Sequence, residues 1–190
     1  MSIHLLETIQ NNLHYPPLKK IDPNTQELKA GAEHTFSQAA IPAVLIGFYT
    51  YSGHDTGAER ILRGVTSSNW VSEIFGNKAA EVVQKVASYG SCSYDETLSK
   101  MNEISNEAVN VVRTAVKPSG TIMDVKNLLS NQVKDILKYL PAALQMGQVV
   151  KEESLDDNTN KMEGPISSLM HKISSAFSNP SNESEVNTKQ

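Results

Sequence analysis

The longest nearly unbroken apolar stretch of this chain runs from Ala39 to Tyr51 and contains a proline, Pro42. A helix that spans a bilayer takes ~20 residues, so this stretch is too short to cross a membrane. An interior proline costs a helix ~3 kcal/mol, because its nitrogen carries no hydrogen to donate. Burial of apolar neighbours offsets that cost, since each fully buried side chain contributes ~1.5–3 kcal/mol. The stretch therefore predicts a core helix that kinks or restarts at Pro42.

A similar segment, Leu-Pro-Ala-Ala-Leu-Gln-Met-Gly, returns at residues 140–147, with Pro141 in the place of Pro42. In both segments Leu or Ile precedes the proline, alanine follows it, and a glycine comes soon after. The residues before the two segments match poorly, and Asp135 falls opposite Phe36. Similar packing needs explain the likeness better than an internal duplication. We predict a second proline-kinked core helix here.

Helical periodicity continues through the rest of the chain as far as about residue 150. Leu98, Met101, Ile104 and Ala108, for example, recur at three- and four-residue spacing and share one face of a helix. Alternation at period two is absent over any useful length, and the hairpin dipeptides Asn-Gly and Asp-Gly do not occur. With 190 residues, 39% of them hydrophobic, the chain can bury a proper core. We predict an all-α fold, a multi-helix bundle with two proline-kinked core helices.

Composition divides the chain into four parts. Residues 1–150 make the predicted helical bundle domain, and residues 151–164 are polar and acidic, as is typical of a linker. Residues 165–177 have the pattern of an amphipathic helix. Residues 178–190 are rich in Asn, Ser and Glu, and we predict a disordered tail.

Short polar signals predict where the helices of the bundle begin and end. Helix starts are expected at residues of the N-cap type, namely Ser2, Asp22 before Pro23, Asp55 or Thr56, Ser68, Asn77, Ser93 with Glu96, and Thr121 with Asp124. Two glycines, Gly76 and Gly90, are expected to end helices.

Charge and cysteine content restrict the partners and the compartment. The net charge is −4, and Lys and Arg are scattered, with no run longer than Lys19-Lys20. Nucleic-acid binding needs clustered positive charge against phosphate, so we predict no nucleic-acid partner. The single cysteine, Cys92, excludes an intramolecular disulfide framework and fits a reducing compartment. The N-terminal residues lack the basic region of a signal peptide. Together these features predict a cytoplasmic protein with no integral membrane segment.

No motif in the chain assigns a catalytic, cofactor-binding or metal site. The sequence contains neither His-Glu-x-x-His nor any Glu-x-x-His pair, which are the patterns of zinc proteases and of di-iron bundles. The glycine motifs of nucleotide-binding folds and the Gly-x-Ser-x-Gly of hydrolases are also missing. We therefore predict no catalytic residues, no metal and no cofactor.

His54, Asp55 and Cys92 support an enzyme as an alternative. His54 and Asp55 follow the central apolar run in a loop, where a general base can work, and Cys92 precedes a helix N-terminus, a position that favours a reactive thiolate. A hydrolase or transferase with a pocket near these residues requires the three side chains to converge in a concave site. The plainer interpretation is that Asp55 caps a helix and His54 is exposed.

The predicted C-terminal helix has the strongest functional pattern in the chain. Its apolar stripe consists of Ile166, Leu169, Met170, Ile173 and Phe177. The opposite face is rich in serine. The stripe must be covered by the bundle itself, by a protein partner or a second copy, or by a membrane surface. We predict that these five residues bind the partner.

Two pairs of segments carry a family resemblance. Ala40-Ile-Pro-Ala-Val-Leu45 followed by Gly57-Ala-Glu-Arg-Ile-Leu62 gives a proline-centred helix and then a Gly-Ala helix that ends in leucine. The segment 140–144 and the segment Leu155–Ile166 are similar to the closing part of the same pattern. Together they resemble the YidB-like family of bacterial all-helical proteins, a domain of unknown function, over most of residues 1–177. The resemblance implies an all-α bacterial cytoplasmic protein and supplies no catalytic residues.

The sequence thus predicts a non-enzymatic helical interaction or scaffold protein. Its partner is expected to be another protein or a second copy of the chain. Two alternatives stay open: a hydrolase or transferase near His54, Asp55 and Cys92, and weak peripheral membrane binding through the C-terminal helix.

Overall fold

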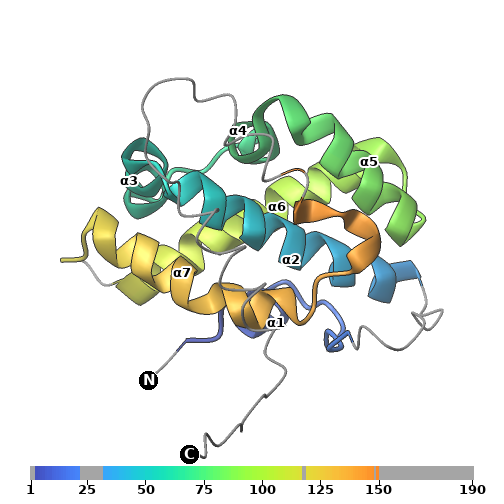
Figure 1. Cartoon of the computed structure of the whole chain (residues 1–190), viewed down its shortest axis with the longest axis horizontal. Coiled ribbons are helices and arrows are strands. Elements are labelled where there is room, and N and C mark those ends of the chain that lie inside the picture. Colours follow the sequence, from blue (N-terminus) through green and yellow to red (C-terminus); the bar gives the residue numbers. More distant parts are fainter. Residues whose placement is uncertain (1–2, 22–31, 117–118, 148, 150–190) are drawn as a thin grey trace, which may run out of the picture.

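Helix α2 (Ala32–Ser52) is the central helix of the structure, and each of the other described α-helices contacts it (Figure 1). The computed structural model describes residues 3–21, 32–116, 119–147 and 149. The remaining elements are, in order, α1 (Leu5–Asn12), α3 (Asp55–Arg63), α4 (Trp70–Phe75), the 3₁₀ turn η1 (Gly76–Lys78), α5 (Ala79–Gly90), α6 (Tyr94–Val116), α7 (Ile122–Leu137) and the 3₁₀ turn η2 (Ala142–Leu144). These described residues contain no strand, so the predicted all-α bundle is confirmed.

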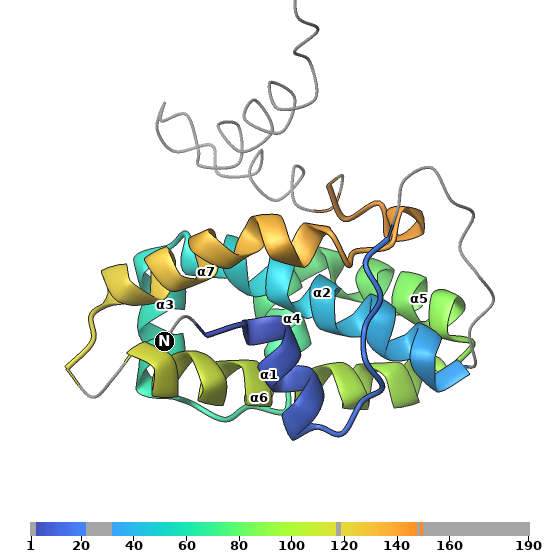
Figure 2. The ribbon, with the colours of Figure 1, turned by 90° about the horizontal axis from the view of Figure 1, so that it is seen from below.

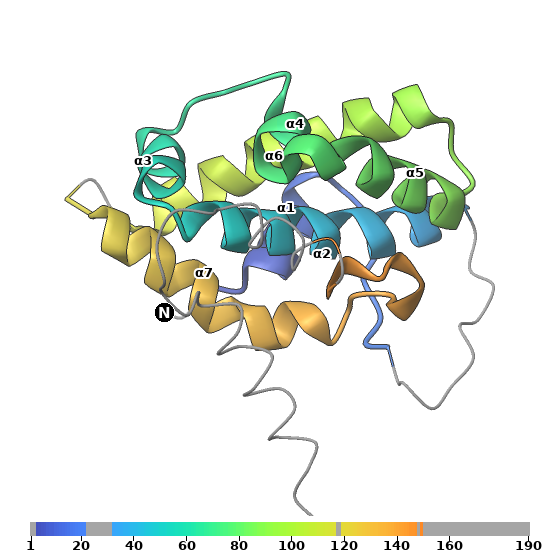
Figure 3. The ribbon, with the colours of Figure 1, turned by 45° about the horizontal axis from the view of Figure 1, so that its top comes forward.

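The helices form three layers around α2. Helices α6 and α7 lie on opposite sides of it, and α1, α4 and α5 lie at intermediate depth (Figure 2). Helix α5 runs alongside α2, whereas α3 lies across its C-terminal end and contacts both α6 and α7 (Figure 3). This arrangement directs the apolar faces of all the α-helices into one core.

The apolar run of the sequence forms the central turns of α2, with Pro42 inside the helix. Six residues around the proline are completely buried, namely Ala39, Ala40, Ile41, Ala43, Val44 and Leu45. Pro42 cannot donate a hydrogen bond to the carbonyl of Gln38, four residues earlier. Burial on every side of the helix offsets that loss. The prediction of a core helix that contains this proline is confirmed.

The second proline segment is not a helix, which corrects the prediction for residues 140–147. Helix α7 ends at Leu137, and Pro141 has an extended conformation with ψ at 130°. In a continued helix the N–H of residue 141 would donate to the carbonyl of Leu137, and a proline has no N–H to donate. The helix therefore ends where its hydrogen-bond ladder would fail.

Contacts from the N-terminal segment and from α2 stabilise the chain after α7. The carbonyl of Lys138 accepts a hydrogen bond of 2.8 Å from the backbone N–H of Ile21. The carbonyl of Tyr139 accepts one of 2.7 Å from the side chain of Gln38. Because these carbonyls bond to distant segments, the chain leaves the helix and returns to the core, where it buries Leu144, Met146 and Val149.

Three buried glutamines hold the N-terminal residues against the bundle. The side-chain amide of Gln38 donates to the carbonyl of Lys19 and accepts from the N–H of Lys19, each at 2.9 Å. It thus pairs with the backbone of Lys19 as the backbone of a neighbouring β-strand would. Gln132 of α7 contacts the carbonyl of Ile3 and the N–H of Leu5 at the start of α1. Gln10 accepts from the N–H of Leu18. Side-chain amides thus satisfy backbone groups that no helix pairs.

Two glycines permit close packing on α2. A Cβ atom at Gly47 would lie 2.6 Å from the ring of Phe75, and one at Gly90 would lie 3.0 Å from the Cα of Phe36. Gly90 is the last residue of α5, and the left-handed position that ends the helix is Ser91, with φ at 53°. The expectation that Gly90 itself terminates the helix is therefore off by one residue. Gly90 instead lets α5 pack closely against Phe36 of α2.

The helix starts agree with the sequence signals in part. Thr121 and Asp124 form the predicted capping box of α7. At α6 the Ser93 hydroxyl accepts from the N–H of Glu96, while the Glu96 carboxylate pairs with Lys100 at 2.7 Å. Helix α3 begins at Asp55, and no side-chain cap hydrogen bond is made at its N-cap. Asp55 bonds to another helix instead.

Several predictions fall on residues that the structure does not describe. These are the helix starts at Ser2 and at Asp22, the linker at 151–164, the C-terminal helix at 165–177 and the tail at 178–190. The partner-binding stripe from Ile166 to Phe177 lies outside the described residues as well, and it stays a prediction.

Candidate functional site

The structure separates the three residues of the enzyme alternative. Cys92 follows α5, whose last residue, Gly90, packs against Phe36 near the start of α2. His54 and Asp55 come directly after the other end of α2, at Ser52. The helix from Phe36 to Ser52 is roughly 24 Å long at 1.5 Å per residue. The convergence that a hydrolase or transferase requires at these residues is not met.

Asp55 joins two helices. Its carboxylate accepts a hydrogen bond of 2.6 Å from Lys126 of α7, and the same ammonium group donates at 2.9 Å to the carbonyl of Gly53. The hydrogen bond and the positive charge of Lys126 lower the pKa of Asp55. His54 beside it is exposed. Asp55 therefore fixes the turn between α2 and α3 onto α7.

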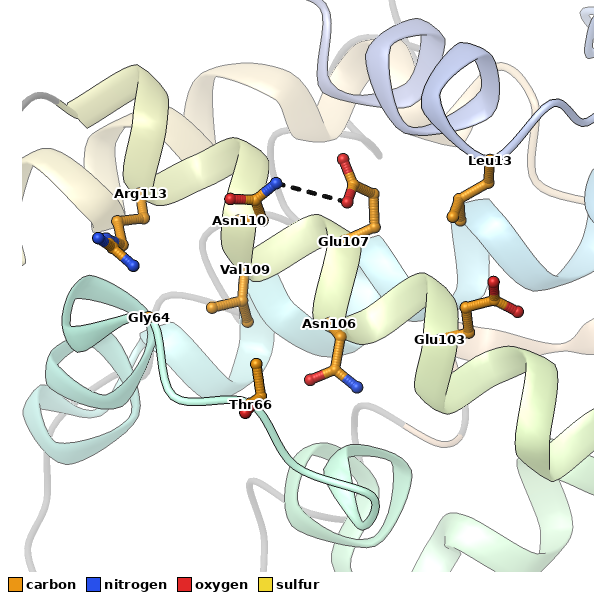
Figure 4. A pocket seen from close by; sticks show the side chains of 9 residues that line it. All are labelled: Leu13, Gly64, Thr66, Glu103, Asn106, Glu107, Val109, Asn110 and Arg113. Carbon is orange, nitrogen blue, oxygen red and sulfur yellow. Dashed lines mark hydrogen bonds between the residues drawn. The ribbon is translucent and has the colours of Figure 1, made fainter.

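A groove lies along α6 (Figure 4). Its volume is about 420 Å³. The loop after α3 forms one wall, and the end of α1 contributes Leu13. The lining residues are Leu13, Gly64, Thr66, Glu103, Asn106, Glu107, Val109, Asn110 and Arg113. Helix α6 thus supplies most of the surface, with its apolar stripe turned to the core and its polar stripe turned to solvent.

Asn106 fastens the loop between α3 and α4 to the groove. Its side chain accepts from the N–H of Ser67 at 2.9 Å and donates to the carbonyl of Ser67 at 2.9 Å. It also accepts from the indole nitrogen of Trp70 at 3.1 Å. One turn earlier, Asn102 accepts from the N–H of Val71. These amides give the wall of the groove a defined position.

Opposite charges occupy the two ends of the groove. Glu103 and Glu107 lie toward Leu13, and Arg113 lies beside Gly64 (Figure 4). Gly64 has φ at 65°, and a Cβ atom there would lie 2.5 Å from Cδ of Arg113, so glycine suits both the backbone and the arginine. Glu107 accepts a hydrogen bond of 2.6 Å from Asn12. Carboxylate, amide and guanidinium groups in this order can bind a polar surface by hydrogen bonds and ion pairs.

A cluster surrounds Trp70, the only tryptophan of the chain, whose indole nitrogen is bonded to the groove residue Asn106. Trp70 is completely buried, and the guanidinium of Arg60 lies 5.5 Å from its ring centroid. Arg60 also pairs with Glu73 at 2.7 Å. The Tyr51 ring packs edge-on against Trp70, with centroids 6.1 Å apart. Burial raises the pKa of Tyr51, and the charge of Arg60 opposes that rise. The cluster is a packing feature with a satisfied indole nitrogen.

A smaller cavity of about 150 Å³ lies where α1 meets the end of α7. Its ionisable residues include His4, Glu7, Lys20, Asp135 and Lys138. Lys138 donates to Asp135 at 2.6 Å and lowers the pKa of that carboxyl. Positive and negative groups are mixed here, so the cavity has no strong preference for an ion of either sign.

Within the ranges that the structure describes, no group of three or more His, Cys, Asp or Glu side chains could hold a metal ion. The helices among those residues include none that is long and apolar enough to cross a bilayer. The groove was not predicted from the sequence. Its signal was present in the spacing of Asn102, Asn106 and Asn110, which places three amides on successive turns of one helix face.

Comparison of the chain with protein-family models, with curated proteins and with solved structures gives no match.

Proposed function

We propose that this chain is a non-enzymatic helical interaction or scaffold protein that binds a protein partner or a second copy of itself. The observation that carries the proposal is how the bundle uses its polar side chains. Gln38, Asn106 and Lys126 each bind the backbone of a segment distant in the sequence. Such contacts fix surface loops and chain ends, which is what a preorganised binding surface requires.

The proposed partner surface is the stripe of Ile166, Leu169, Met170, Ile173 and Phe177. On the helix predicted for residues 165–177 these five apolar side chains would share one face, and such a face favours docking into an apolar groove of a protein. The proposal places the protein in the bacterial cytoplasm as a relative of the YidB-like family. Its supports are the sequence resemblance and the single cysteine.

The test compares Leu169→Asp with Ser168→Asp in the full chain. The first change puts a charge in the stripe, and the second puts the same charge on the opposite face. Leu169→Asp should lower the molar mass measured by light scattering, or remove proteins that the wild-type chain captures from its own cells. Ser168→Asp should do neither. If both variants behave like the wild type in both measurements, the stripe binds no partner.

Membrane binding is distinguished in the same experiment. Sedimentation with anionic liposomes that is lost in Leu169→Asp and kept in Ser168→Asp assigns the stripe to a lipid surface. The enzyme alternative has no support from the geometry, because Asp55 is bonded to Lys126 and lies at the opposite end of α2 from Cys92.

A further inference from the structure

Residues 15–21, here called the strap, cross α2 and end beside the chain that follows α7 (Figure 2). The strap forms neither helix nor strand. Gln38 of α2 bonds both the N–H and the carbonyl of Lys19 in the strap. Gln10 of α1 accepts a hydrogen bond from the N–H of Leu18. A segment that is held by a few side-chain hydrogen bonds opens at a lower free energy than a packed helix does.

The strap is bonded to the chain that leaves α7, residues 138–147, here called the exit segment. The N–H of Ile21 donates to the carbonyl of Lys138 at 2.8 Å. Among the described residues, this is the one backbone–backbone hydrogen bond outside the helices that joins segments distant in the sequence. The NH₂ group of Gln38 donates to the carbonyls of Lys19 and Tyr139, at 2.9 and 2.7 Å. One side chain thus holds the strap and the exit segment together.

The exit segment covers the core with apolar side chains. Leu144 is 1% exposed, Met146 is 2% exposed, and the 3₁₀ turn η2 contacts α5. The hydrogen bonds inside η2 join residues of the turn and its flanks to one another, so they do not hold the segment on the bundle. Release of the strap removes the bond from Ile21 and two of the bonds that orient Gln38. The exit segment is then held mainly by the packing of its apolar side chains.

We propose that the strap is a latch on the exit segment, so that the two leave the bundle together and uncover Leu144 and Met146. The inference rests on the proposed function and names its regulation, because the exit segment precedes the stripe at 166–177 in the chain. With the latch closed, these two apolar side chains are buried. With the latch open, they add to the apolar surface that the stripe offers to a protein partner. A partner that binds the open form binds more tightly when a larger fraction of the chain is open.

Thiol labelling of the full-length chain measures the release directly. In a Cys92→Ser background, Met146→Cys reports on the exit segment, and Val112→Cys reports on a buried position of α6. Ile21→Pro removes the N–H that donates to Lys138. Ile21→Ala is the matched control, because it shortens the same side chain and keeps the N–H.

The labelling rate at position 146 should be about fivefold higher with Ile21→Pro than with Ile21→Ala, which is the effect of one lost hydrogen bond on an opening equilibrium. The rate at position 112 should be the same in both variants. Equal rates at position 146 overturn the latch. An equal increase at both positions overturns it as well, because it means that the whole fold opens rather than the exit segment.

Coupled release must work in both directions. Leu144→Ala weakens the packing of the exit segment and should speed amide exchange at Lys19 and Ile21 several-fold relative to the amide of Val112. Gln145→Ala, an exposed neighbour in the same segment, is the control and should leave all three exchange rates unchanged. If Leu144→Ala does not alter exchange in the strap, the two segments open independently and there is no latch.

Light scattering separates the latch from the proposed function, with a second copy of the chain as the partner. Self-association should be at least about fivefold tighter with Ile21→Pro than with Ile21→Ala, and Leu169→Asp should remove it in both. Equal self-association in the two variants, or a monomer in both, rejects regulation by the latch. If Leu169→Asp has no effect while Ile21→Pro still tightens association, the stripe fails as the partner surface and the latch stands.

Discussion

The two proline segments have similar sequences and different structures. Pro42 lies inside α2, and the helix continues across it. Pro141 lies four residues after the end of α7, in an extended conformation. The difference between them is the environment. The residues around Pro42 are enclosed by the other helices, whereas Leu140 is half-buried and both Ala142 and Ala143 are exposed. A helix keeps a proline where burial compensates for the missing hydrogen bond.

Hydrogen bonding reinforces the same contrast. Each proline removes the bond to a carbonyl four residues earlier, which is that of Gln38 in one segment and that of Leu137 in the other. After Leu137, the carbonyls of Lys138 and Tyr139 bond to Ile21 and Gln38. The second segment therefore has tertiary partners for its backbone that replace a helix. Four measurements can break or sharpen this comparison.

The largest effect is expected from core truncation beside Pro42. Leu45→Ala should lower the free energy of unfolding by about 2–5 kcal/mol, because Leu45 is completely buried. Leu140→Ala, next to the other proline, should cost about 1 kcal/mol, since its side chain is only half-buried. Urea titration followed by the fluorescence of Trp70 measures both. Similar losses in the two variants would mean that burial does not distinguish the segments.

The second largest effect is expected at Gln38, which connects the two regions. Gln38→Ala leaves the N–H and carbonyl of Lys19 and the carbonyl of Tyr139 without their partner. We expect a loss of about 2–3 kcal/mol in the free energy of unfolding. Gln84→Ala on the exposed face of α5 is the control and should change it by less than about 0.5 kcal/mol. Faster amide exchange at Lys19 and Ile21 should accompany the loss. An unchanged exchange rate would argue that the hydrogen bonds of Gln38 do not hold the N-terminal segment in place.

Replacing the prolines should give effects of opposite sign. Pro42→Ala restores a helical hydrogen bond worth up to ~3 kcal/mol and loses part of a packed ring, so we expect a gain of about 1 kcal/mol. Pro141→Ala restores no helix and increases the freedom of the unfolded chain, so we expect a loss of about 0.4–1 kcal/mol. Thermal unfolding of both variants decides the matter. The comparison fails if the two changes have the same sign.

The smallest effect concerns the ion pairs near the ends of these helices. Lys126 lowers the pKa of Asp55 in the folded state. Their ion pair therefore stabilises the folded state at any pH above the ordinary pKa of aspartate, 3.8. This stabilisation is lost as the pH falls through the lowered pKa of Asp55. The melting temperature of Lys126→Met should be lower than that of the wild type at neutral pH and should approach it in acid. Lys134→Met should show a difference that does not depend on pH in this range. If the difference in melting temperature between Lys126→Met and the wild type is the same at every pH, the ion pair of Asp55 and Lys126 does not contribute to the stability of the fold.

The sequence predicts the core better than it predicts the surface. The apolar spacing in α6 placed Met101, Ile104 and Ala108 in the core, and all three are buried. The capping box at Thr121 and Asp124 was also read correctly, because a cap depends on residues within one turn. The groove along α6 was missed, since its walls come from segments far apart in the chain. No pattern of neighbouring residues predicted that Cys92 and Asp55 lie at opposite ends of α2 either.

What the sequence determined by itself was the helical class, the buried faces and the central position of the run from Ala39 to Tyr51. These follow from the 3.6-residue period and from the free energy of apolar burial, which are properties of neighbouring residues. The tertiary structure decided which of the two prolines stays in a helix. That choice depends on the helices that enclose Pro42 and on the bonds that Ile21 and Gln38 make to the carbonyls after α7. The same residues thus fold differently because their neighbours in space differ.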